Sequence, residues 1–295
     1  MPVVIDAPAH HLTWTTVMGS AASQSFIVSL IAEVQPDEVY NLAAQSHVHN
    51  SWLWPVETCE TNGLGLVNLL DGAGTSELFG QSGAEVQDEL TTFGPTTPYA
   101  TSKAFAHWTA VNYREKYGMF VVNGILFNHE SPRRGPSFRT YKLTEGMAQT
   151  HAGLIPAALV GNPLTKRDWG HVRDFVRGMW MSLQVESPDD YVFATGVTHT
   201  IKDFVECGFR TVGRVIEWSG EGEQQVAVDK KTGEVVVRID PIEFKQQSHH
   251  TRGDPSKAER LLGWKREFTF EVCLLVLDFE SFACSGVRTV KGHWR

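Results

Sequence analysis

The sequence predicts an α/β fold in which helices cover both faces of an incomplete parallel sheet, joined to a smaller α/β lobe. Two observations lead to this prediction. Helical and strand-like apolar patterns alternate between residues 21 and 126, and such alternation is typical of parallel sheets. Apolar residues make up 42% of the 295-residue chain, which is ample for one large core or two joined ones.

The predicted elements follow one another in a regular order. The pattern indicates a helix over residues 21–34 and then a strand at 38–44 that ends in small residues. A second helix is expected over 56–70, and a third over 99–117, where the sequence is rich in helix formers and has no internal proline or glycine. An apolar run at 120–126 predicts the strand that follows.

This regular alternation stops after residue 135, so we expect two domains. Residues 1–135 and 165–205 should form the sheet domain, and residues 136–164 and 206–295 the smaller lobe. Thr200, followed three residues later by an aspartate, predicts the capped start of a helix.

Composition restricts the classes of function. The net charge of −8 argues against broad nucleic-acid binding, and no apolar run approaches the ~20 residues of a membrane helix. The N-terminus carries no secretory signal pattern. Four widely spaced cysteines without a Cys-x-x-Cys pair indicate reduced thiols and a cytoplasmic protein. Twelve histidines are present, but their close pairs lack the spacing of zinc hydrolases, so no metal site is predicted.

One pair of side chains suggests acid–base chemistry. Tyr99 and Lys103 are four residues apart in the predicted helix and therefore lie on one face of it. A phenol titrates near pH ~10 and becomes a useful base only where a positive charge stabilises its anion, which Lys103 supplies. Such a pair alone is weak evidence, because many chance pairs lie on plain helix surface.

Neighbouring segments strengthen this evidence. Their order and most of their spacings resemble those of GDP-mannose 4,6-dehydratases, which are extended short-chain dehydrogenase/reductase enzymes with a Rossmann-like sheet. The similar segments are residues 34–48, 75–80, 98–103, 122–135, 166–174 and 253–264. The run Asn-His-Glu-Ser-Pro-Arg-Arg-Gly at 128–135 is specific to the family, and the resemblance extends over roughly residues 19–275.

The resemblance implies an NADP-dependent lyase that converts GDP-mannose to GDP-4-keto-6-deoxymannose, a step towards GDP-fucose. Tyr99, held by Lys103, would remove the C4 hydroxyl proton while a hydride leaves C4 for NADP⁺. Glu77 would take the C5 proton, and Thr75 with Glu77 would assist loss of the C6 hydroxyl as water before the hydride returns to C6. Glucose-type dehydratases usually carry Asp-Glu after the threonine, so Ser76-Glu77 favours the GDP-mannose branch. The alternative is that Thr75-Ser-Glu is only a fragment of a helix cap.

The same resemblance assigns binding roles and an assembly. It places Ala43, Gln45 and Ser46 in a cofactor-lining turn, at the edge of the sheet where open α/β folds bind ligands. The cofactor-binding residues it implies are Ala43, Gln45, Ser46, Lys103, His129 and Arg134, and the substrate-binding residues are Asn128, Arg167 and Lys245. It also implies a homo-oligomer.

Two departures from the family leave other interpretations open. The chain has no Gly-x-Gly-x-x-Gly turn, and most of the family's first three strands have no counterpart, although residues 3–6 are a candidate for a substitute strand. Four residues, 71–74, stand where the family has a helix end and a whole strand, too few to replace that strand. These gaps suggest N-terminal truncation and an internal deletion. A non-catalytic remnant or interaction subunit, or an imperfect gene sequence, would have the same pattern.

Overall fold

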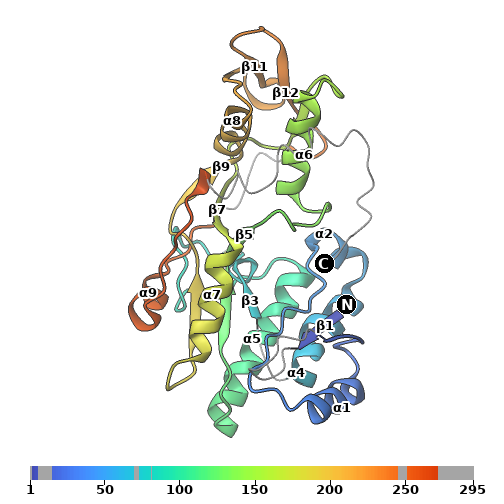
Figure 1. Cartoon of the computed structure of the whole chain (residues 1–295), viewed down its shortest axis with the longest axis vertical. Coiled ribbons are helices and arrows are strands. Elements are labelled where there is room, and N and C mark those ends of the chain that lie inside the picture. The colour runs from blue at the N-terminus through green and yellow to red at the C-terminus, as the bar shows by residue number, and fades with distance from the viewer. Residues whose placement is uncertain (1, 6–14, 70–72, 81, 245–250, 272–295) are drawn as a thin grey trace. The chain divides into compact units, whose positions relative to one another are not determined.

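The computed structural model describes residues 2–5, 15–69, 73–80, 82–244 and 251–271, and the chain divides into two compact units (Figure 1). The first unit comprises residues 1–128, 173–196 and 251–266, and the second comprises 129–172, 197–250 and 267–295. Within the described residues no helix is long and apolar enough to cross a membrane.

A short parallel sheet is the centre of the first unit. Its strands are β3 (Ala73–Thr75), β4 (Asn123–Leu126) and β8 (Asp190–Phe193), with β4 in the middle and parallel to both neighbours. The strands β1 (Pro2–Ile5) and β2 (Thr15–Met18) form a separate antiparallel pair. The substitute strand expected at residues 3–6 therefore forms, but it pairs with β2.

The described part of this unit contains seven α-helices. They are α1 (Gln24–Val34), α2 (Val48–Leu53), α3 (Pro55–Cys59), α4 (Gly65–Leu69), α5 (Pro98–Tyr117), α7 (Val172–Leu183) and the short α9 (Ser256–Leu262). The first residue of α7 is assigned to the other unit. A π-helical turn, Glu60–Leu64, joins α3 to α4, so the helix predicted at 56–70 exists but is interrupted at its centre.

Two expectations about the sheet were wrong. Residues 38–44 form no strand, although their composition predicts one. Residues 39–42 instead border a small apolar cavity together with Gly124 of β4 and Phe193 of β8. Residues 71–74 were also expected to be too few to replace the family's strand. Ala73–Thr75 nevertheless forms a three-residue strand that pairs with β4. A short strand is possible here because its partner supplies the hydrogen bonds.

The core of the first unit explains one domain boundary. Trp264, which follows α9, is buried and its indole lies edge-on to the rings of Phe175 on α7 and Phe193 on β8. Its indole nitrogen donates to the backbone oxygen of Asp174 at 2.7 Å. Residues 251–266 therefore fold with the sheet, whereas the sequence assigned them to the smaller lobe. Residues 129–135, 165–172 and 197–205 conversely belong to the second unit.

The described part of the second unit contains two small sheets. One has the order β10 (Ile216–Ser219), β11 (Val226–Asp229), β12 (Val235–Ile239) and β6 (Ala158–Val160), and the other has the order β5 (Asn128–Glu130), β7 (Lys166–His171) and β9 (Thr198–Thr200). The helices α6 (Arg139–His151) and α8 (Ile201–Thr211) pack with them around a buried apolar core. Thr200 caps α8 in a capping box with Asp203, which confirms the predicted helix start.

Candidate active site

Helix α5 carries the predicted Tyr–Lys pair into the core of the first unit. Thr97 caps the helix by accepting a hydrogen bond from the backbone N–H of Ala100, and Gly118 ends it in the left-handed region with φ 64°. Tyr99 and Lys103 are both 7% exposed and lie one turn apart, as predicted. The two side chains are therefore buried against the rest of the unit rather than displayed on plain helix surface.

Burial changes the chemistry of Lys103. Removing its ammonium from water lowers its pKa from 10.5 to about 8. At neutral pH the side chain is still mostly charged. It can therefore act as the cation that favours a nearby phenolate or donates to hydroxyl oxygens, at a cost in folding free energy.

The predicted Thr–Glu pair lies where β3 ends. Thr75 is the last residue of β3, and its hydroxyl caps the following 3₁₀ turn, Ser76–Leu78, by accepting from the N–H of Glu77 at 3.4 Å. Both β3 and this turn pack against α5. The structure thus brings all four predicted catalytic residues onto neighbouring elements of one unit. The capping role considered as the alternative is present, and it does not exclude the predicted catalytic role.

The predicted cofactor-lining turn is fixed by a residue that the sequence analysis missed. Asn62, in the π-helical turn, accepts from the N–H of Gln45 at 2.8 Å and donates to its backbone oxygen at 3.1 Å. The same amide group donates to the hydroxyl of Ser102 at 3.2 Å, and Ser102 donates to the backbone oxygen of Tyr99. Asn62 is 3% exposed. A buried asparagine thus connects the turn to the catalytic helix.

The remaining members of that turn lie as follows. Ala43 and Gln45 are half-buried, whereas Ser46 is exposed. The Gln45 side chain donates to the hydroxyl of Thr58 on α3 and accepts from the backbone N–H of His47. These bonds hold the turn against the helices even though residues 38–44 form no strand. Asn128, a predicted substrate contact, is the first residue of β5, two positions after the end of β4, and is half-buried.

The second unit holds three further predicted residues. His129 lies in β5, and Arg167 lies in the neighbouring strand β7. Arg134 is held by two groups: its guanidinium carbon lies 3.9 Å from the centre of the Phe138 ring, and its Nε lies 3.4 Å from a carboxylate oxygen of Glu130. Lys245 lies outside the described residues.

Glu130 is an unusual buried carboxyl. It is 2% exposed, and burial raises its pKa although Arg134 and a hydrogen bond from Thr140 at 2.8 Å both favour the charged form. Its other oxygen, Oε1, has no hydrogen-bond partner among the described residues. The family motif contained this glutamate, but the sequence analysis gave it no role.

The described residues contain no group of three histidine, cysteine, aspartate or glutamate side chains that could hold a metal ion. The four predicted catalytic residues supply a phenol, a buried amine, a hydroxyl and a carboxylate. These groups are suited to moving protons on a hydroxylated substrate.

Comparison with known proteins places the fold and these groups in a class. The protein RMD of Pseudomonas aeruginosa, solved as a complex with NADPH, superposes with a TM-score of 0.76 at 22% identity, covering 93% of this chain and 92% of that one. A dTDP-glucose 4,6-dehydratase of Bacillus anthracis, solved with NAD, gives a TM-score of 0.71 at 20% identity over 90% and 79%. These likenesses show that the fold is of the Rossmann type.

Sequence comparison defines the family. The family model for GDP-mannose 4,6 dehydratase matches residues 5–275, beginning earlier than the resemblance at residue 19 suggested. The GDP-mannose 4,6 dehydratase of Dictyostelium discoideum is 41% identical over 283 residues, covering 91% of this chain and 80% of that protein. The human protein of the same name is 40% identical over 268 residues, covering 86% and 72%. The chain belongs to the GDP-mannose 4,6-dehydratase family.

Proposed function

We propose that this chain is a GDP-mannose 4,6-dehydratase that uses NADP(H). Family membership over residues 5–275 carries the proposal, and the first unit supports it because Thr75, Glu77, Tyr99 and Lys103 lie on neighbouring elements. The product would be GDP-4-keto-6-deoxymannose, and the reaction would be redox-neutral overall with the loss of one water.

The residues of the chain fit the nicotinamide end of the cofactor. Lys103 offers a buried amine that is a cation below its pKa of about 8, suited to the hydroxyls of a ribose. Gln45 and its neighbours in the turn held by Asn62 would line the same ligand. For His129 and Arg134, the family resemblance alone implies contacts with the nicotinamide and its phosphate. When bound, NADP⁺ supplies the group that accepts a hydride and later returns it.

Each catalytic side chain then has a distinct proton to move. Tyr99 as phenolate takes the proton of the C4 hydroxyl while the hydride leaves C4, and the resulting ketone acidifies the hydrogen on C5. Glu77 takes that C5 proton. Thr75 and Glu77 together deliver that proton to the C6 hydroxyl, which departs as water. The hydride then returns to C6, and C5 takes up the proton that Tyr99 removed from the C4 hydroxyl. Asn128, Arg167 and Lys245 would hold the GDP-sugar.

Mass spectrometry tests the proposal directly. Purified chain is incubated with GDP-mannose and NADP⁺, next to Tyr99→Phe as the matched control. Loss of one water from the sugar nucleotide, absent in the control, is the expected result. Unchanged sugar from folded protein would contradict the proposal and favour a non-catalytic remnant, for which the comparisons give no support.

A second variant separates oxidation from elimination. Glu77→Gln leaves Tyr99 and Lys103 intact, so C4 oxidation should still proceed while removal of the C5 proton fails. We expect absorbance of NADPH at near-stoichiometric yield without loss of water from the sugar. Full dehydration by Glu77→Gln would remove Glu77 from the mechanism.

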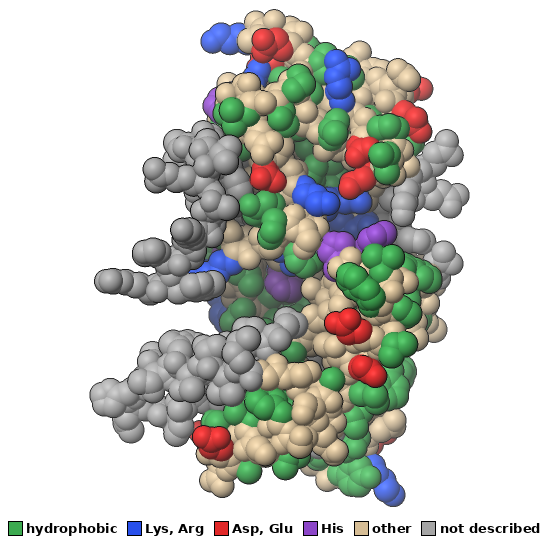
Figure 2. Space-filling model, turned by 90° about the vertical axis from the view of Figure 1, so that its right-hand side faces the viewer, with side chains coloured by type: hydrophobic (Ala, Val, Ile, Leu, Met, Phe, Trp, Pro, Cys, Tyr) green, Lys and Arg blue, Asp and Glu red, His purple; other side chains and the backbone are tan. Residues whose placement is uncertain are grey.

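We further propose that the chain works as a homo-oligomer in the cytoplasm. Large apolar side chains are exposed on the packed helices α2, α3 and α5, and Figure 2 shows hydrophobic side chains at the surface of the face it presents. The exposed members are Trp52, Leu53, Val56, Phe105 and Trp108. A patch of this kind on several adjoining helices is typical of a surface that another protein copy covers. The described cysteines, Cys59 and Cys207, are free thiols, which fits a reducing compartment.

A further inference from the structure

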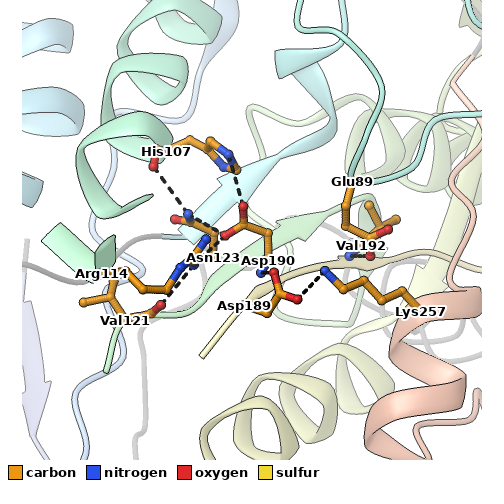
Figure 3. A network of polar contacts seen from close by, with 9 residues as sticks. All are labelled: Glu89, His107, Arg114, Val121, Asn123, Asp189, Asp190, Val192 and Lys257. Atoms are coloured by element: carbon orange, nitrogen blue, oxygen red, sulfur yellow. Dashed lines mark hydrogen bonds and ion pairs between the residues drawn. The ribbon is translucent and has the colours of Figure 1, made fainter. Parts of the chain in front are cut away.

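Helix α5 is attached to the sheet by a polar cluster that lies further along the helix than Tyr99 and Lys103. His107 lies one turn beyond Lys103 on the same buried face and is 5% exposed. Its Nε2 lies 3.4 Å from Oδ2 of Asp190, the first residue of β8 (Figure 3). Two turns further along α5, Arg114 donates to the other oxygen of Asp190 at 2.8 Å.

Asn123 joins the carboxylate of Asp190 to the backbone of α5. Asn123, the first residue of β4, donates to Oδ1 of Asp190 at 2.9 Å and lies 3.4 Å from the backbone oxygen of His107. Arg114 also donates to the backbone oxygen of Val121 at 3.2 Å. Figure 3 shows His107 and Arg114 reaching from the helix to one carboxylate. The helix is therefore held at two points along its axis, which fixes its rotation and its position along the sheet.

The protonation of His107 suits this role. Burial lowers its pKa, and the Arg114 guanidinium lowers it further, although Asp190 opposes both effects. The imidazole is therefore neutral at physiological pH and has one N–H. That proton belongs on Nε2, which faces Asp190, because Nδ1 is buried with no hydrogen-bond partner among the described residues.

We propose that His107 is a positioning residue for the dehydratase reaction. Its contact with Asp190 fixes the rotation of α5 and its position along the sheet, and thereby the positions of Tyr99 and Lys103. The three residues recur every fourth position, and His107 lies about 6 Å along the helix axis from Lys103. A displacement of reacting groups by about 1 Å can cost up to about 100-fold in rate. The expected effect on the reaction rate rests on the proposed function, whereas the anchoring of α5 rests only on the contacts with Asp190.

The kinetic test uses His107→Leu, His107→Gln and Asn112→Ala. Leucine removes the donor, glutamine can place an N–H close to the position of Nε2, and Asn112 is an exposed residue of the same helix. We expect His107→Leu to lower kcat about tenfold with KM for GDP-mannose changed less than about twofold, because only the reacting groups move. His107→Gln should recover most of kcat, and Asn112→Ala should match wild type. Equal kcat for His107→Leu and wild type, or no recovery with glutamine, would overturn the proposal.

A measurement without turnover separates this inference from the proposed function. Hydrogen–deuterium exchange of the free protein should show faster exchange at residues 99–107 in His107→Leu, with unchanged exchange in the second unit and in Asn112→Ala. Uniform acceleration throughout the first unit would mean that His107 only stabilises the fold and would overturn the positioning role. If the wild type were inactive but His107→Leu still showed the localised change in exchange, the proposed dehydratase activity would be wrong and the anchoring role of His107 would stand.

Discussion

The side-chain amide of Asn62 donates to the hydroxyl of Ser102 at 3.2 Å while it pairs with both backbone groups of Gln45. One buried side chain thus joins the proposed cofactor turn to the helix of Tyr99. It occupies the π-helical turn between α3 and α4. Such turns occur frequently at functional sites, because the extra residue redirects a side chain inward.

Replacement of Asn62 should therefore affect both folding and cofactor binding. In Asn62→Leu the backbone N–H and oxygen of Gln45 lose their partners, so we expect the free energy of unfolding to fall by about 2–3 kcal/mol. The turn should also loosen, which raises the Kd for NADP⁺. Urea unfolding and a fluorescence titration with NADPH measure the two effects.

Asn68→Leu is the matched control, because the side chain of Asn68 makes one hydrogen bond with the described residues, to the backbone oxygen of Ala21 at 3.0 Å. We expect a loss of about 1 kcal/mol from it and an unchanged Kd. If the two variants behaved alike, Asn62 would have no special part in shaping the turn.

The Asn62 link also shows what the sequence can predict here. The helix of Tyr99 and Lys103 follows from its cap, its helix-forming residues and its spacing, and it forms within one residue of the expected start. Asn62 could not be identified in the same way, since its role depends on a π-helical turn and on Ser102, forty residues further along the chain. Local patterns carry no information on such pairings.

The missing strand at 38–44 has a related cause. Its residues have strand composition, but a strand also needs a neighbour with free backbone groups over its length. One edge strand of the described sheet, β3, has only three residues, Ala73–Thr75, which pair with β4. Residues 39–42 pack their side chains beside β4 and β8 without a ladder. Composition thus identified the apolar segment, and the absent partner decided its conformation.

Lys103 should reduce stability at neutral pH. Its pKa in the folded protein, about 8, is below the ordinary 10.5, so folding disfavours the charged form. The cost is fully present below pH 8, on the order of 3 kcal/mol, and fades as the pH rises to 10.5. Lys103→Met should therefore unfold at higher urea than wild type at pH 7 while losing dehydratase activity, and the difference should shrink towards pH 10.

The contrary result is a less stable Lys103→Met at pH 7. It would show that contacts of the ammonium outweigh the cost of burying it. Lys116→Met, near the exposed end of the same helix, controls for the loss of a lysine as such and should not change the pH dependence.

Glu130 should make the opposite contribution to pH dependence from that of an ordinary paired carboxylate. Its folded pKa is raised by burial, so the stability that it contributes is fully present at acid pH, below the unfolded pKa, and is lost as the pH rises through the folded value. Glu130→Gln keeps an acceptor for Thr140 but cannot ionise. The free energy of unfolding of the variant, minus that of wild type, should therefore increase between pH 5 and pH 8. Urea unfolding at the two pH values measures this difference.

Thr140→Val separates the hydrogen bond from the charge. The Thr140 hydroxyl donates to Glu130 at 2.8 Å, which favours the ionised carboxyl. Loss of this hydrogen bond should raise the pKa of Glu130 further. The free energy of unfolding of the double variant, Thr140→Val with Glu130→Gln, minus that of Thr140→Val alone should therefore increase even more between pH 5 and pH 8. A flat difference in both comparisons would mean that Glu130 is charged throughout this pH range.

Self-association through α2, α3 and α5 can be tested by placing a charge in the exposed patch. Val56 on α3 is 69% exposed, so Val56→Glu should leave the fold intact while burial of its carboxylate disfavours an interface. Light scattering after gel filtration should show the wild type as a multimer and Val56→Glu at or near the mass of one chain. Leu90→Glu, at an apolar site that is 91% exposed in a loop, is the matched control and should keep the wild-type mass. The interface would lie away from these helices if Val56→Glu remained a multimer while Leu90→Glu did not. An unpaired charge carries an energetic cost only on the surface that loses water when the copies associate.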